Sequence, residues 1–311
     1  MKFACVFPGQ GSQSVGMMAE LAEEYPLVEA LFARASEVLG YDLWKVVQEG
    51  PEEELNKTEV TQPAMLTAGV AVYEILMSKL AESPVLYAGH SLGEYSALVC
   101  AGSIDFESAV KLVAERGRLM QQAVPDGVGA MAAIIGLDDA VIIEICDTAS
   151  DDNFAVQAVN FNSPGQVVIA GNIQAVETAM AMAKEAGAKR TLKLPVSVPS
   201  HSNLMEVAAK PLAAFLKGIK VKKTTLPVIQ NVGAKAHARA ADIKKSLVKQ
   251  LHNPVLWVDT VNNLIAEGVD ATVECGPGKV LLSLNKRINK EASHFTVNDV
   301  SSLNAAVEEL T

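Results

Sequence analysis

Cysteine and aromatic residues are scarce in this chain of 311 residues, in which only 5% of the side chains are aromatic. The 4 cysteines form no C-x-x-C pair and are scattered over the chain at Cys5, Cys100, Cys146 and Cys275. This spacing argues against a disulfide framework and against a zinc site, and it fits a reducing cytosol. We therefore expect a protein that holds no metal.

Positive charge and long apolar runs are lacking as well. The chain has 26 Lys and Arg residues against 36 Asp and Glu residues, and its net charge of −10 argues against general nucleic-acid binding. The apolar stretch before Pro8 is too short for the core of a signal peptide, and we find no apolar run that approaches transmembrane length. We expect a soluble, cytoplasmic protein that binds neither nucleic acid nor a membrane.

Half of the residues are hydrophobic and 20% are charged, which is typical of a globular protein with a large core. Strand and helix patterns alternate through most of the chain and predict an α/β fold, with a mainly parallel sheet covered on both faces. The strands are expected at residues 2–7, 84–88, 227–231 and 271–275. The helices are expected at residues 17–25, 27–39, 63–80, 105–123, 204–216, 241–250 and 259–267.

The middle of the chain has a different pattern. Two helices are expected at residues 138–149 and 173–186, and four strands at residues 130–135, 154–161, 166–170 and 190–198. This β-α-β-β-α-β order is the ferredoxin-like arrangement. We predict a compact insert at residues 128–198 within a discontinuous parent domain made of residues 1–127 and 199–311.

Residues 89–93 read GHSLG and fit the G-x-S-x-G nucleophile elbow, which places a serine on a sharp turn between a strand and a helix. An apolar run precedes the motif, and a helix-compatible segment that stops at Gly102 follows it. Glycines suit the flanks because a Cβ there would crowd the strand and the helix. Ser91 is the candidate nucleophile; the alternative is a serine at an ordinary helix N-cap.

A serine nucleophile needs a base, and the chain has five histidines. His201 lies in a short polar cluster where the predicted insert returns to the parent domain, and clefts favour such junctions. His90 adjoins Ser91, but neighbours across a tight turn usually point apart. We therefore predict His201 as the base. No aspartate stands out as a third member, so a backbone carbonyl or an amide is left to orient the imidazole.

Arg116 lies on the apolar stripe of the predicted helix 105–123, which is an unusual place for a charge. One interpretation is that its aliphatic stem is buried while its head reaches water, or that a protein carboxylate pairs with it. The other is that a substrate supplies the missing anion, because a guanidinium donates two parallel hydrogen bonds to a carboxylate.

A glycine-rich turn, residues 8–13 (PGQGSQ), follows the first predicted strand. Ligand sites in parallel α/β sheets gather at this edge. The amide of Gln10 or the N–H groups of the turn can stabilise an oxyanion, together with the N–H of Leu92, the residue after the nucleophile.

Eight stretches, in order and over nearly the whole chain, closely resemble the malonyl-CoA:acyl carrier protein transacylases of bacterial fatty acid synthesis. They are residues 7–13 (FPGQGSQ), 61–64 (TQPA), 89–95 (GHSLGEY), 116–117 (RG), 129–133 (GAMAA), 160–166 (NFNSPGQ), 196–201 (VSVPSH) and 274–279 (ECGPGK). The resemblance implies an α/β-hydrolase-like core with a ferredoxin-like insert, and an acyltransferase that uses no cofactor.

The resemblance also implies roles for single residues. Ser91 is the acylated nucleophile and His201 the base, Arg116 pairs with the malonyl carboxylate, and Gln10 and the Leu92 amide form the oxyanion site. The backbone carbonyl of Gln250 orients the histidine, and Asn160 and Asn162 line the cleft without an assigned role. The implied partners are malonyl-CoA and acyl carrier protein. Two alternatives stay open, a serine thioesterase and a catalytically idle carrier-binding module.

Overall fold

The computed structural model of the protein describes residues 1–125, 127–196 and 198–311, and within these residues it contains two sheets. The larger sheet has six strands in the order β10-β9-β1-β2-β7-β8, and β8 alone pairs antiparallel with its neighbour. The strands are β1 (Phe3–Phe7), β2 (Leu86–Gly89), β7 (Val228–Gln230), β8 (Lys235–Ala236), β9 (Ala271–Cys275) and β10 (Ser293–Val297).

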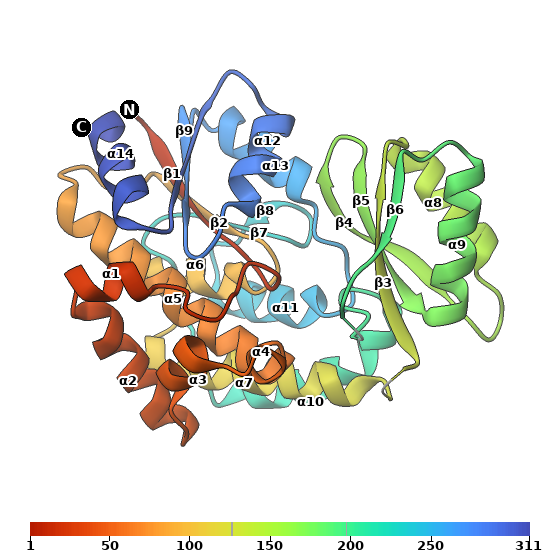
Figure 1. The fold of residues 1–311 in the computed structure, drawn as a ribbon, viewed down its shortest axis with the longest axis horizontal. Coiled ribbons are helices and arrows are strands. Elements are labelled where there is room, and N and C mark those ends of the chain that lie inside the picture. Colours follow the sequence, from red (N-terminus) through yellow and green to blue (C-terminus); the bar gives the residue numbers. More distant parts are fainter. Residues whose placement is uncertain (126, 197) are drawn as a thin grey trace.

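Helices cover both faces of this sheet, as the burial of β1, β2 and β9 along their whole length requires (Figure 1). Alternate residues of β1 point to opposite faces: Phe3, Cys5 and Phe7 join the main core, whereas Ala4 and Val6 pack toward α12 and α13. The helices are α1 (Ala19–Glu24), α2 (Leu27–Leu39), α3 (Leu43–Glu49), α4 (Glu52–Leu55), α5 (Thr58–Lys79), α6 (Gly93–Cys100), α7 (Phe106–Ala123), α10 (Glu206–Lys217), α11 (Ala240–Gln250), α12 (Trp257–Ala266), α13 (Val280–Ile288) and α14 (Val300–Leu310), with a 3₁₀ turn at Asn203–Met205.

The smaller sheet is antiparallel, in the order β4-β5-β3-β6, and lies beside the larger one at the right of Figure 1. Its elements are β3 (Gly129–Ile135), α8 (Asp139–Ala149), β4 (Val156–Ser163), β5 (Gln166–Asn172), α9 (Ile173–Glu185) and β6 (Arg190–Lys193). One face, with Ala132 and Ile169, packs on α8 and α9. The opposite face carries a small separate cluster that includes Met131 and Val168.

The loop segment before α12 pairs with the smaller sheet. Val255, just before α12, forms a parallel bridge with β4: its N–H donates to the Val159 carbonyl (2.9 Å), and its own carbonyl accepts from the Phe161 N–H (3.0 Å). On the rim, Arg287 of α13 donates to the side chain of Gln166 (2.8 Å). These contacts fix how β4 sits against the larger unit.

Several predicted boundaries were wrong. Helix α5 starts at Thr58 instead of residue 63, because burial of its first turns outweighs the hydrogen bond that Pro63 cannot donate inside the helix. Strand β6 ends at Lys193, shortly before Pro195, instead of reaching residue 198; residue 197 of that prediction lies outside the described residues. The sequence patterns also missed α3, α4, β8, α13, β10 and α14.

The expectation that no apolar segment reaches transmembrane length was also wrong. Helix α5 is long and apolar enough to cross a membrane by length and composition, although 83% of its most apolar window is buried inside the protein. This burial is what the central helix of a packed core shows, and Figure 1 places α5 among the other helices that cover the larger sheet.

Candidate active site

The turn after β2 holds Ser91 in a left-handed conformation, with a φ of 51°. Such a conformation is strained for a residue with a Cβ, and it recurs where function fixes the backbone. The flanking glycines let the strand and helix come this close: a Cβ on Gly89 would lie 2.0 Å from the Gly93 backbone, and one on Gly93 would lie 2.0 Å from the Phe7 carbonyl oxygen. The result is a sharp strand-to-helix elbow with the serine at its tip.

The Ser91 Oγ lies 2.8 Å from Nε2 of His201, which is itself 3% exposed. The other ring nitrogen, Nδ1, lies 2.7 Å from the backbone carbonyl oxygen of Gln250. Because a carbonyl only accepts, Nδ1 carries the proton and Nε2 is free to accept the hydroxyl proton of Ser91. Burial, and next the charge of Arg116, lower the pKa of His201 from 6.5 to about 3, so the imidazole is neutral near pH 7.

Arg116, on α7, is 1% exposed and lies beside the nucleophile. Its Nη2 donates to Ser91 Oγ (3.2 Å) and to the side-chain oxygen of Gln250 (3.0 Å), and its Nη1 donates to the side-chain oxygen of Gln62 (2.9 Å). Burial lowers the pKa of Arg116, but a guanidinium stays charged in proteins.

All the groups that accept from Arg116 are neutral. Among the described residues, no carboxylate oxygen lies within 4.0 Å of its guanidinium. A buried charge without an ion-pair partner is costly, and an anionic ligand at this point would offset the cost. The arrangement can therefore hold a carboxylate next to the Ser91 hydroxyl.

A cleft of about 630 Å³ opens above Ser91 and is lined by both units. The larger unit contributes Gln10, Leu92 and Arg116, and the smaller unit contributes Asn160 and Asn162 among others. The Leu92 N–H lies at the N-terminus of α6, where backbone donors lack partners within the helix. All the site residues predicted from the sequence except Gln250 thus line one cleft. Gln250 contacts the nucleophile by donating to the Ser91 carbonyl.

The two asparagines of the smaller unit differ in their surroundings. Oδ1 of Asn162 lies 2.8 Å from Nε2 of His90, so Asn162 links the two units next to the elbow. The centroid of the His90 ring lies 5.6 Å from that of Trp257. Asn160 is 5% exposed and forms the bridge residue opposite Val255. His90 therefore makes contacts away from the Ser91 hydroxyl, as expected for a neighbour across a tight turn.

Sequence reasoning missed four polar side chains that the structure links to the site by hydrogen bonds, namely Gln62, Glu94, Gln230 and Asn231. All four are buried. Asn231 Oδ1 accepts from the Ser91 N–H (2.7 Å), and its Nδ2 donates to the Gly89 carbonyl (2.6 Å). The available signals were a glutamine and a glutamate inside apolar helices, and an asparagine at the carboxyl end of β7, where parallel sheets bind ligands.

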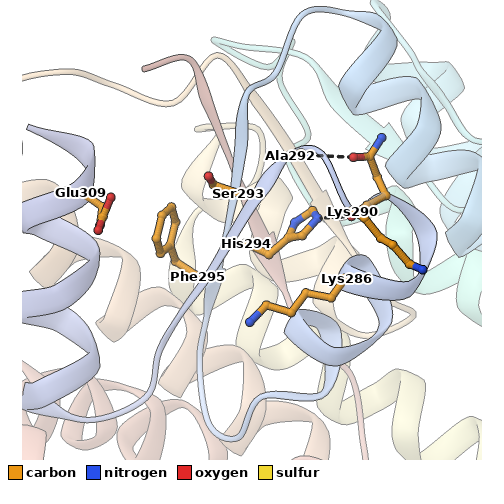
Figure 2. A pocket seen from close by; sticks show the side chains of 8 residues that line it. Lys286, Lys290, Ala292, Ser293, His294, Phe295 and Glu309 are labelled. Carbon is orange, nitrogen blue, oxygen red and sulfur yellow. Dashed lines mark hydrogen bonds between the residues drawn. The ribbon is translucent and has the colours of Figure 1, made fainter.

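A second cavity, of about 510 Å³, lies between α13, β10 and α14 (Figure 2). Lys286 and Lys290 line it together with Ser293, Phe295 and Glu309. His294 contributes no free base, because its ring nitrogens lie 2.8 Å from the Thr272 hydroxyl and 2.8 Å from the Asn289 carbonyl. In the described part of the chain, no group of three or more His, Cys, Asp or Glu side chains could hold a metal ion.

The comparisons agree with this geometry. Residues 4–305 match the family model for the acyl transferase domain. The malonyl CoA-acyl carrier protein transacylase of Haemophilus influenzae is 57% identical over 308 residues, which cover 99% of this chain and 98% of the relative. The relative of the same name from Bacillus subtilis is 46% identical over 99% of this chain and 97% of its own.

Solved structures are equally similar. The malonyl CoA-acyl carrier protein transacylase of Coxiella burnetii superposes with a TM-score of 0.98 at 47% identity, covering 100% of this chain and 98% of that one. A malonyl-transacylase solved in complex with a type II polyketide synthase acyl-carrier protein superposes with a TM-score of 0.97 at 55% identity, covering 99% of this chain and 100% of that one. This chain belongs to the acyl transferase family and, within it, to the malonyl CoA-acyl carrier protein transacylases.

Proposed function

We propose that this enzyme moves a malonyl group from malonyl-CoA to the phosphopantetheine thiol of acyl carrier protein, in fatty acid biosynthesis. The observation that carries the proposal is the buried Arg116 guanidinium, whose hydrogen bonds go to neutral acceptors and whose Nη2 lies 3.2 Å from Oγ of the nucleophile. It provides for an acyl group that bears its own carboxylate. The names of the relatives above point to the same donor and acceptor.

In the first half-reaction, His201 Nε2 takes the proton of the Ser91 hydroxyl while Oγ attacks the thioester carbon of malonyl-CoA. The charge that develops on the carbonyl oxygen is stabilised by Gln10 and the Leu92 N–H, which both line the cleft. When the tetrahedral intermediate collapses, the C–S bond breaks and coenzyme A leaves with the proton held by His201. A malonyl ester of Ser91 remains.

In the second half-reaction, the thiol of the carrier gives its proton to His201 and its sulfur attacks the ester carbon. The C–O bond to Ser91 breaks, Oγ regains a proton from His201, and the malonyl thioester of the carrier departs. The Gln250 carbonyl orients the imidazole in both halves. The reaction needs no cofactor, since coenzyme A is part of the substrate. The result is a ping-pong mechanism.

The proposal also includes a division of the chain into a core and an insert. The order β4-β5-β3-β6, with α8 and α9 on one face, supports a ferredoxin-like insert at residues 128–198. The elbow after a parallel strand supports an α/β-hydrolase-like core made of residues 1–127 and 199–311. A cytoplasmic location remains a prediction from the sequence.

The test is the intact mass of the protein after incubation with malonyl-CoA, followed by addition of acyl carrier protein. We expect one malonyl adduct that is stable in buffer and moves to the carrier. Ser91→Ala should form no adduct, whereas the control Ser301→Ala, at an exposed position of α14, should form it normally. Rapid loss of the adduct to water without a carrier would instead indicate a thioesterase, and absence of any adduct would indicate an idle carrier-binding module.

A further inference from the structure

Glu94 is a fully buried carboxylate three residues after the nucleophile, in the first turn of α6. It forms no ion pair within the described residues. Its oxygens accept three hydrogen bonds, from the side chain of Gln230 (2.7 Å), the backbone N–H of Asn231 (2.8 Å) and the side chain of Gln250 (2.9 Å). Burial raises the pKa of Glu94, and these donors oppose the rise. Burying a carboxylate costs more free energy than burying an apolar side chain of the same size, which points to a role for Glu94 in the site.

Two of these donors belong to residues that hold the elbow. Asn231 accepts from the Ser91 N–H through Oδ1, and Gln250 donates to the Ser91 carbonyl through Nε2 (3.0 Å). Both peptide groups of the strained serine are therefore fixed by side chains of residues that are themselves bonded to Glu94. This places the carboxylate one contact away from the nucleophile.

Together with the Ser91 carbonyl, the carboxylate determines which way the Gln250 amide faces. A carboxylate only accepts, so the NH₂ end of the amide must point to Glu94 and the oxygen end to the other side. On that other side, Oε1 accepts from Nη2 of Arg116 at 3.0 Å. If the amide turned over, its NH₂ group would face the guanidinium, and two donors would oppose each other. The orientation of Gln250 therefore supports the position of Arg116 beside Ser91.

We propose that Glu94 is a positioning residue for the choice of acyl group: through Gln250 it holds the Arg116 fork where a malonyl carboxylate can bind next to Ser91. Glu94 touches neither the substrate nor the reacting atoms. The inference rests on the proposed function, in which Arg116 binds the malonyl carboxylate. It goes beyond that function by naming the group that keeps the arginine in place.

The test compares the acylation kinetics of Glu94→Gln with malonyl-CoA and with acetyl-CoA. The variant keeps the side-chain volume but removes the charge and one acceptor oxygen, so the Gln250 amide is held only by a neutral acceptor and by the Ser91 carbonyl. We expect the ratio of kcat/KM for malonyl-CoA over acetyl-CoA to fall by about tenfold or more. The matched control is Glu274→Gln, in which another fully buried carboxylate, bonded to the N–H groups of Leu281 and Leu282, receives the same change. Its ratio should stay at that of the unaltered protein.

A ratio that stays unchanged in Glu94→Gln, whether both rates fall together or neither falls, overturns the inference. If thermal unfolding shows that this variant does not fold, Glu94→Asp decides by the same ratio, because it keeps the charge but is too short to reach all three donors. The unaltered protein and Arg116→Ala are measured alongside. If the unaltered protein does not prefer malonyl-CoA, or if Arg116→Ala leaves its preference intact, the proposed function itself fails, and not only the role of Glu94.

Discussion

The two units of this protein contribute to the same cleft in different ways. Beneath Ser91, the larger unit places a layer of buried polar groups in which Arg116, Gln250 and Glu94 are linked by hydrogen bonds. The smaller unit lines the cleft mainly with apolar groups from the free face of its sheet, including Met131 and Val168. The larger unit therefore supplies the reacting groups, and the smaller unit mainly encloses the cleft.

The physical reason for this difference lies in the cost of buried polar groups. Most of the buried polar groups of the larger unit are bonded to one another, and these bonds hold the nucleophile, base and guanidinium in place. Among the described residues, Nε of Arg116 and Oε1 of Gln230 have no hydrogen-bond partner. An apolar wall tolerates substitution and repacking more easily. Changes in the larger unit should therefore lower kcat or selectivity, whereas changes in the smaller unit should mainly raise KM.

The strongest test of this comparison is Arg116→Ala in the polar layer. Loss of the guanidinium removes the partner of the malonyl carboxylate, so we expect kcat/KM for malonyl-CoA to fall by about 10²- to 10³-fold. Acylation by acetyl-CoA, which has no carboxylate, should change far less. The control is Arg118→Ala, two residues along the same helix, where the side chain is 43% exposed and pairs with Glu115. Equal losses with both substrates would contradict the carboxylate role.

The pH dependence of acylation tests the polar layer without changing its shape. Burial and the charge of Arg116 hold the pKa of His201 at about 3, so the free enzyme keeps a neutral base well below pH 7. At pH 5 a histidine with an ordinary pKa of about 6.5 would retain only about one part in thirty of its neutral form. We expect kcat/KM measured by acyl-enzyme mass to stay flat down to about pH 5. An acid limb near pH 6.5 would contradict this.

The lowered pKa of His201 also affects how the free energy of unfolding depends on pH. In the unfolded chain His201 takes up a proton near its ordinary pKa of 6.5, whereas in the folded protein it takes one up only near 3. As the pH falls between these values, the unfolded state binds a proton that the folded state does not, so the free energy of unfolding decreases. His201→Gln should make this decrease smaller in urea unfolding curves measured across that range.

The sequence could indicate much of the site because its residues carry local signals. Ser91 lies in a spaced motif, and Arg116 is a charge on an apolar helix stripe. The partners of these residues carry weaker signals. Glu94 and Gln62 are single polar residues in apolar helices, and what they bind depends on helices and strands that meet only in the folded chain.

The boundaries of helices and strands were also predicted correctly where local sequence signals set them and wrongly where tertiary contacts do. Where local chemistry decides, the prediction was confirmed. The helix predicted at residues 105–123 begins directly after Asp105, which accepts from the Ser108 N–H, and β9 spans Ala271–Cys275 as expected. Where tertiary packing decides, it was wrong, as at the start of α5. The C-terminal elements α13, β10 and α14 were missed, although the buried Leu303, Ala306 and Leu310 of α14 recur at helical spacing and β10 completes one edge of the larger sheet.

The smallest expected effect comes from the enclosing side of the cleft. Asn162→Ala removes the 2.8 Å contact with His90 that links the smaller unit to the elbow. One such bond contributes about 1 kcal/mol, so we expect KM for malonyl-CoA to rise by about three- to tenfold, while kcat stays nearly constant because the polar layer is untouched. The control is Asn304→Ala, at an exposed position of α14. A fall in kcat comparable to that of Arg116→Ala would show that the smaller unit also positions the reacting groups, and the contrast between the two units would then no longer hold.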